Sequence, residues 1–99
     1  MNSLEKLILQ TITDYLNENG FEADLDNEMI HIHISFNDAI ITLEDNDITI
    51  SFSITTNPTD SAIITKLVME ASAEYKLYKV EICEPYLEVF DENDEFINM

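Results

Sequence analysis

Apolar residues recur at helical spacing over residues 4–18, while most of the acidic residues there lie off the apolar stripe. Asn2 or Ser3 is a suitable cap for the start of this segment. Gly20, the only glycine in the chain, follows where a left-handed residue commonly closes a helix. The pattern predicts an amphipathic helix whose apolar stripe consists of Leu4, Leu7, Ile8, Ile12, Tyr15 and Leu16.

Apolar and polar residues then alternate, which is the pattern of half-buried strands. Residues 30–36 and 48–55 alternate strictly, and residues 39–43 form a third apolar segment between them. Polar pairs at Asn37-Asp38 and residues 44–47 separate the three segments and are predicted to be turns. Each alternating strand has one apolar face and one small polar face. An antiparallel meander with helices on one side and water on the other is therefore expected.

A second helix is predicted after Asn57-Pro58, which ends the strand pattern. Thr59 or Asp60 is expected to cap this helix, which should run to about Ala73. Its apolar stripe consists of Ile63, Ile64, Leu67, Val68 and Ala71. Packing of both helices on one face of the sheet is expected to bury Ile30, Ile32, Ile34, Ile50, Phe52, Leu67 and Val68.

Two more strands are predicted near the C-terminus, at residues 77–82 and 86–90, with a turn at Glu84-Pro85. The expected fold class is therefore α+β, in the order α-β-β-β-α-β-β, with a mainly antiparallel sheet and two helices packed on one face. Residues 1–99 show no linker and no internal repeat, so a single domain is expected. Residues 91–99 form an acidic tail that is expected to fray.

Charge is the feature that sets this chain apart, because 21 acids face four lysines and no arginine, for a net charge of −17. Fourteen isoleucines and nine asparagines are typical of A/T-rich coding, which should also favour lysine. The scarcity of lysine therefore indicates a physical reason for removing positive charge. Three uses are open: solubility, adaptation to salt, and repulsion of or competition with nucleic acids. Adaptation to salt fits least well with so many large aliphatic residues.

The sequence contains no recognisable catalytic or cofactor-binding set, so a non-enzymatic protein without a cofactor is expected. One glycine cannot supply a glycine-rich phosphate loop. Cys83, the only cysteine, fits a reducing compartment and is expected to be a buried thiol. No apolar run approaches the roughly 20 residues that span a bilayer, and the N-terminus does not resemble a signal peptide. Cytoplasmic location without membrane contact is therefore expected.

Two histidines on one strand, His31 and His33, are the residues that most resemble metal ligands. On a strand they point to the same face, and a third ligand from a neighbouring strand would complete a zinc site. No cysteine or third histidine accompanies them, so two polar residues on a solvated face are the favoured interpretation. The acidic runs 44–47 and 91–95 lack the glycine and the final glutamate of a calcium loop, and no metal site is expected.

Acidic residues gather in short clusters, which are the candidate binding residues. Four scattered lysines cannot bind a phosphate backbone, so direct nucleic-acid binding is not expected. Carboxylates spaced along a strand or helix resemble a row of phosphates and favour a basic, nucleic-acid-binding protein as the partner. The candidate clusters are Asp24, Asp26 and Glu28; Glu44, Asp45 and Asp47; Glu81, Glu84 and Glu88; and Asp91, Glu92, Asp94 and Glu95. The second and fourth clusters are the preferred sites, since such dense acidic segments are expected to protrude.

In length, in the missing arginine and in the clusters at 44–47 and 91–95, the chain resembles the small acidic proteins of phages and mobile elements. These proteins, DNA mimics and anti-CRISPR proteins, block host nucleases. The resemblance covers the whole chain in character, without a shared motif. It implies inhibition of a basic nuclease or CRISPR effector by occupation of its nucleic-acid-binding surface.

Two other resemblances remain open. The order of elements is similar to that of type III secretion chaperones, which are acidic, cytoplasmic dimers. That resemblance implies a homodimer with Ile63, Leu67 and Met69 at its interface, although the chain is short and lacks a third helix. The charge is also similar to that of immunity proteins and antitoxins that plug basic toxins. A solubility role for the charge is the alternative to all three.

Overall fold

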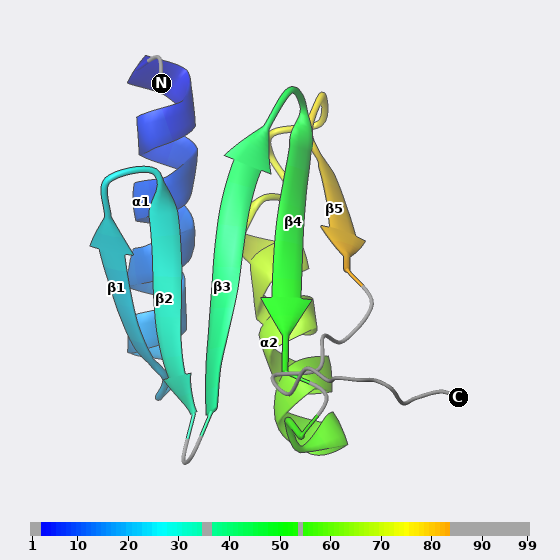
Figure 1. The fold of residues 1–99 in the computed structure, drawn as a ribbon. Coiled ribbons are helices and arrows are strands. Elements are labelled where there is room, and N and C mark those ends of the chain that lie inside the picture. The colour runs from blue at the N-terminus through cyan, green and yellow to red at the C-terminus, as the bar shows by residue number, and fades with distance from the viewer. Residues whose placement is uncertain (1–2, 35–36, 54, 84–99) are drawn as a thin grey trace, which may run out of the picture.

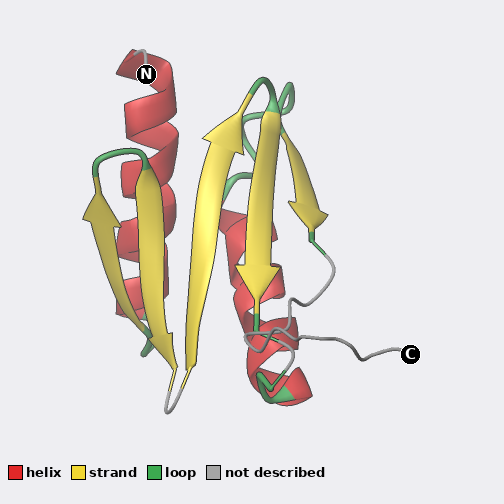
Figure 2. Cartoon of the chain, viewed as in Figure 1, coloured by secondary structure: helices red, strands yellow, loops and turns green. Residues whose placement is uncertain are grey.

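The computed structural model describes residues 3–34, 37–53 and 55–83. Two helices and five strands follow one another as α1 (Ser3–Glu18), β1 (Glu22–Asp26), β2 (Met29–Ile34), β3 (Asn37–Glu44), β4 (Asp47–Phe52), α2 (Pro58–Ala71) and β5 (Lys79–Ile82). The strands lie in the order β1-β2-β3-β4-β5, antiparallel except for β5, which runs parallel to β4 (Figure 1). Both helices cover one face of this sheet (Figure 2), which confirms the predicted α+β class.

Helix α1 ends where its sequence predicts. Gly20 has a positive φ of 94°, and the N–H of Phe21 donates to the carbonyl of Leu16 at 3.1 Å, which closes the last turn. The Asn17 side chain then binds both backbone groups of Ala23, at 2.9 Å each. This pair of hydrogen bonds ties the end of α1 to the next strand.

That next strand, β1, differs from the sequence prediction, which placed its acidic residues outside any strand. Ala23 and Leu25 point toward the core between three carboxylates, and Ala23 pairs with Ile32 of β2. An apolar alternation of two residues is too short to predict a strand by itself. Backbone pairing with β2 and the hydrogen bonds from the Asn17 side chain stabilise this strand, which the local sequence pattern does not predict.

The predicted turn at Asn37-Asp38 is also wrong, because both residues belong to β3. Asp38 pairs with His33, and Asn37 pairs with Ile34. Asparagine and aspartate are common in turns, but here backbone pairing with β2 extends the strand. The predicted turn at 44–47 is narrower in the structure: its two outer residues pair with each other as the last rungs of the β3–β4 hairpin.

Two tight turns connect the hairpins, and each begins with a residue at positive φ. Asn27 has φ 56° in the β1–β2 turn, and Asp45 has φ 53° in the β3–β4 turn. Tight hairpin turns require positive φ at this position, which asparagine and aspartate tolerate better than other side chains.

Replacing Asn27 with alanine is therefore expected to lower the free energy of unfolding by about 1–2 kcal/mol, because alanine is strained at this φ and lacks the short polar side chain with which asparagine can form local hydrogen bonds. Urea unfolding followed by circular dichroism measures the change. Asn27→Gly is the matched control and should be nearly neutral. An alanine variant as stable as the glycine variant would show that the turn adopts another backbone conformation.

Helix α2 starts at Pro58, with Asn57 as its N-cap, slightly earlier than predicted. The Asn57 side chain accepts a hydrogen bond of 2.8 Å from the Thr59 N–H, and proline is well suited to the first helical position. The helix ends at Ala71, two residues before the predicted end, and Ser72 caps its last turn through the carbonyl of Val68.

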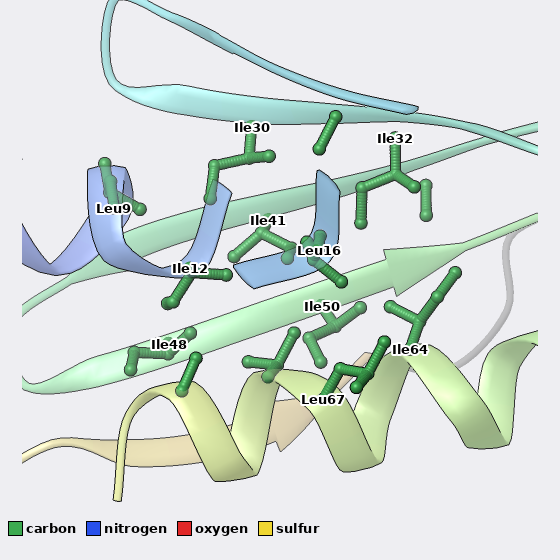
Figure 3. Packing of buried hydrophobic residues seen from close by; sticks show 14 of the residues in the cluster. Leu9, Ile12, Leu16, Ile30, Ile32, Ile41, Ile48, Ile50, Ile64 and Leu67 are labelled. Carbon is green, nitrogen blue, oxygen red and sulfur yellow. The ribbon is translucent and has the colours of Figure 1, made fainter. Parts of the chain in front are cut away.

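The core lies between the sheet and the two helices. Isoleucines of β2, β3 and β4 point toward apolar residues of α1 and α2 (Figure 3). Every residue that the sequence predicts to be buried by this packing is buried: Ile30, Ile32, Ile34, Ile50, Phe52, Leu67 and Val68. Ile32 and Ile50 lie on the same face of the sheet, as expected.

The C-terminal part of the predicted fold is described only as far as Cys83. Strand β5 matches the predicted strand at 77–82 but begins at Lys79. The strand predicted at 86–90 and the acidic tail at 91–99 lie outside the described residues. Within the described residues, neither helix has the length and apolar character needed to cross a membrane.

Candidate functional site

The face of the sheet turned away from the helices, here called the open face, carries the polar member of each strand alternation. Residues that pair across neighbouring strands share a face, so strand register defines which side chains lie on it. Seven carboxylates belong to the open face as described, four of them on the outer strands β1 and β5. They are Glu22, Asp24, Asp26, Asp38, Glu44, Asp47 and Glu81.

The middle of the open face carries no carboxylate or lysine among the described residues and is half-buried. One row across the sheet passes from Asp26 through Met29, Thr42 and Thr49 to Glu81, with a carboxylate at each end. The adjacent row passes from Asp24 through His31 and Ile40 to Ser51. The inner residues of these rows are half-buried, whereas the flanking carboxylates are exposed. Met29 and Ile40 give this centre apolar surface inside an acidic rim, and an apolar centre with a polar rim is the usual anatomy of a protein interface.

Strand β1 presents the most regular row of charges. Glu22, Asp24 and Asp26 are exposed and occupy every second position of an edge strand. Such positions lie about 6.6–6.8 Å apart along a strand. The sequence prediction of a phosphate-like row is thus compatible with β1, although the sequence pattern missed both the strand and Glu22.

Two acidic clusters lie at the same end of the sheet, here called the turn end. It holds the end of β1 with Asp26, the β1–β2 turn with Glu28, and the β3–β4 turn around Asp45 (Figure 1). Glu44 and Asp47 pair directly across the β3–β4 hairpin. Like charges in that position destabilise a hairpin, typically by about 0.2–1 kcal/mol.

Two lysines accompany the acids of the turn end. Lys79 pairs in register with Asp47 at the start of β5. Lys6 of α1 lines a polar hollow together with Asp26 and Glu28. The turn end is therefore acidic but partly balanced, while the β1 row faces no lysine in the strands that the structure describes.

His33 lies between two carboxylates of the open face. Its Nε2 is 3.2 Å from an Asp24 carboxylate oxygen, and its Nδ1 is 3.4 Å from one of Asp38. The hydrogen bond to Asp24 is the main cause that raises the pKa of His33 above its ordinary value of 6.5, and Asp38 and Glu22 add to it. Partial desolvation opposes the shift. The imidazolium form of His33 would partly neutralise this end of the open face.

The raised pKa of His33 predicts a pH dependence of stability. A raised folded-state pKa adds stability that is fully present below about pH 6.5 and is lost as pH rises through the folded pKa. The stability difference between the natural chain and His33→Gln should therefore shrink as pH rises above 6.5. Thermal melting at several pH values measures it, with His31→Gln as the control on the same strand. A difference that stays constant with pH would contradict the coupling of His33 to Asp24.

The described residues contain no group of three or more histidine, cysteine or acidic side chains placed to hold a metal ion. His31 and His33 both lie on the open face, as the alternation predicts. Their neighbours differ: in the described contacts, only His33 has carboxylates at hydrogen-bonding distance.

The prediction of a buried Cys83 is wrong: this thiol is exposed, just past the end of β5. The apolar residues near it lie on a strand at the sheet edge, where burial is incomplete.

The structure thus places seven of the candidate binding residues, and the role of all candidates in binding stays a prediction. Asp24, Asp26, Glu44, Asp47 and Glu81 lie on the strands of the open face, and Glu28 and Asp45 lie in its turns. The predicted residues Asp91, Glu92, Asp94 and Glu95, like Glu84 and Glu88, lie outside the described residues. Sequence reasoning missed Glu22 and Asp38, because it assigned no strand to the first and a turn to the second.

Comparison of the chain with protein-family models, with curated proteins and with solved structures gave no match.

Proposed function

We propose that this protein is a non-enzymatic, cytoplasmic inhibitor that covers a basic surface of a nucleic-acid-handling protein with its open face and turn end. One observation carries the proposal: seven carboxylates rim an open face whose described residues include a single lysine, Lys79. A nuclease, a restriction enzyme or a CRISPR effector has the basic groove that such a face would fit.

Electrostatics and shape support this choice together. An acidic rim steers a basic partner and raises the rate of association, with a strong dependence on salt. The half-buried centre with Met29 and Ile40 offers apolar contact once the partner has docked. An acidic coat that served only solubility would not need this division between rim and centre.

The chaperone-like alternative has less support. It places Ile63, Leu67 and Met69 at a dimer interface on α2. Leu67 is buried in the core of a single chain, so it is not available to a partner, while Ile63 and Met69 are exposed. An immunity protein against a basic toxin nuclease would use the same chemistry as the proposed inhibitor and belongs to the same proposal.

Binding to a panel of purified basic nucleases and CRISPR effectors tests the proposal. A true partner should bind tightly at about 50 mM salt, bind much more weakly at about 200 mM salt, and be displaced by duplex DNA or guide RNA. Inhibition of its nucleic-acid binding should follow the same salt dependence. A partner whose binding is indifferent to salt and to competing nucleic acid would sink the proposal.

A further inference from the structure

His33 stands on the open face with a carboxylate at each of its two ring nitrogens. Nε2 lies 3.2 Å from an oxygen of Asp24 on β1, and Nδ1 lies 3.4 Å from an oxygen of Asp38 on β3. A neutral imidazole has a single N–H, so it can donate to only one of these carboxylates and turns a lone pair toward the other. The imidazolium form donates from both nitrogens. The geometry around His33 is therefore that of the protonated ring.

The register of the sheet brings these groups together. Glu22, His33 and Asp38 lie in one row across β1, β2 and β3, and Asp24 lies in the adjacent row of β1. Side chains in directly opposite or diagonal positions on one face are within reach of each other. Carboxylates from both neighbouring strands thus surround a single imidazole.

The charged groups that face His33 come only from the sheet in the part of the chain that the structure describes. Glu22 and Asp24 face it from β1, Asp38 faces it from β3, and His31 shares its own strand and face. The two helices pack on the opposite face of the sheet and place no charge beside it (Figure 2). None of the four lysines belongs to β1, β2 or β3. The ring is therefore the cation that balances this end of the open face.

We propose that His33 is a proton-controlled switch on the open face: the protonated ring engages Asp24 and Asp38, and loss of the proton frees their charge for a basic partner. The inference deepens the proposed function and rests on it for the nature of that partner. Histidine is the side chain whose charge ordinarily changes between pH 5 and 8. The hydrogen bond with Asp24 is the main cause that raises the pKa of His33, so the protonated form persists closer to neutral pH.

Proton binding and partner binding should therefore oppose each other. A basic partner must either displace the imidazolium from Asp24 and Asp38 or dock on a face with one negative charge fewer. Linkage between two binding events is reciprocal. If a cation binds the neutral form more tightly, the bound cation lowers the pKa of His33 by the same factor. Docking of a basic group at this end of the open face should thus expel a proton from His33.

Binding of an oligo-arginine peptide to the full chain tests the switch, because the charge of arginine does not change in this range. At constant ionic strength, the natural chain should bind the peptide about 2-fold to 20-fold more tightly at about pH 8 than at about pH 5.5, since each exposed ion pair changes affinity by a factor of about five at most. His33→Gln should lose most of this difference. His31→Gln is the matched control on the same strand and face, and it should keep most of the difference. An equal pH dependence in the two variants would overturn the proposal.

NMR titration of the His33 ring gives a readout at the site itself. The peptide should lower the pKa of His33 in the natural chain, and this response should disappear when Asp24→Asn is combined with Asp38→Asn. A His33 pKa that does not move when the peptide binds would overturn the proposal. Failure of the proposed function is distinguishable: nucleases and CRISPR effectors would then not bind at any pH, while the response of His33 to oligo-arginine would remain.

Discussion

Reversing Glu22, Asp26 and Glu81 to lysine is expected to slow association with the proposed basic partner by about 10-fold to 1,000-fold at low salt, the range that electrostatic steering supplies. All three side chains are exposed on the rim of the open face. A single rim charge is worth only about 0–1 kcal/mol, so one substitution alone should do little. Stopped-flow or biosensor kinetics over a range of salt concentrations measures the effect, which should fade as salt increases.

The matched control is the triple variant with Asp14, Glu18 and Glu74 changed to lysine. These residues are exposed on the helix layer, and each reversal adds two charges, so both variants change the net charge from −17 to −11. The control should retain most of the association rate. Equal slowing in both variants would show that total charge matters and that the open face has no special role. Unchanged kinetics in both would assign the charge to solubility alone.

The turn end needs a different design, because Asp45 has a positive φ that lysine would strain. Glu44→Lys combined with Asp45→Asn and Asp47→Asn removes the cluster with less strain at that position. The variant should associate more slowly, while its stability should hold or rise slightly, since the like charges that pair across the hairpin are gone. Loss of binding together with loss of folding would leave the turn end without support as a binding site.

Replacing Ile41 with alanine is expected to lower the free energy of unfolding by about 2–5 kcal/mol. Ile41 is fully buried on the central strand β3 and lies between the sheet and the helices (Figure 3). Alanine would remove apolar burial and leave a cavity. A domain of this kind is stable by only about 5–15 kcal/mol, so the loss is a large fraction of the total. The urea midpoint should fall while the m-value stays constant.

Ile40→Ala is the matched control, since Ile40 is the preceding residue on the open face and is only half-buried. Its effect on stability should be clearly smaller. If the centre of the open face contacts the partner, Ile40→Ala should also weaken the complex mainly through faster dissociation, without changing the salt dependence. Equal destabilisation by the two variants would contradict the assignment of faces to β3.

Local pattern alone was enough to predict both helices, three of the four strands of the meander (β2, β3 and β4), strand β5, and the side of the sheet that forms the core. The reason is that the spacing of apolar residues along the chain shows which side chains share the buried face of a strand or helix. Apolar and polar residues alternate without exception over residues 30–36 and 48–55, and each helix carries an apolar stripe. The net charge of −17 likewise follows from the sequence alone. It is the basis on which a basic partner is proposed.

Tertiary pairing decided the rest. Glu22–Asp26 has only Ala23 and Leu25 as apolar residues, and it becomes a strand because β2 and the Asn17 side chain satisfy its backbone. Asp38 leaves its predicted turn for the same reason and comes to lie beside His33. The open face exists only as an assembly of residues from five strands. Strand order and register depend on backbone hydrogen bonds and shared burial between distant segments, and these leave no local signal in the sequence.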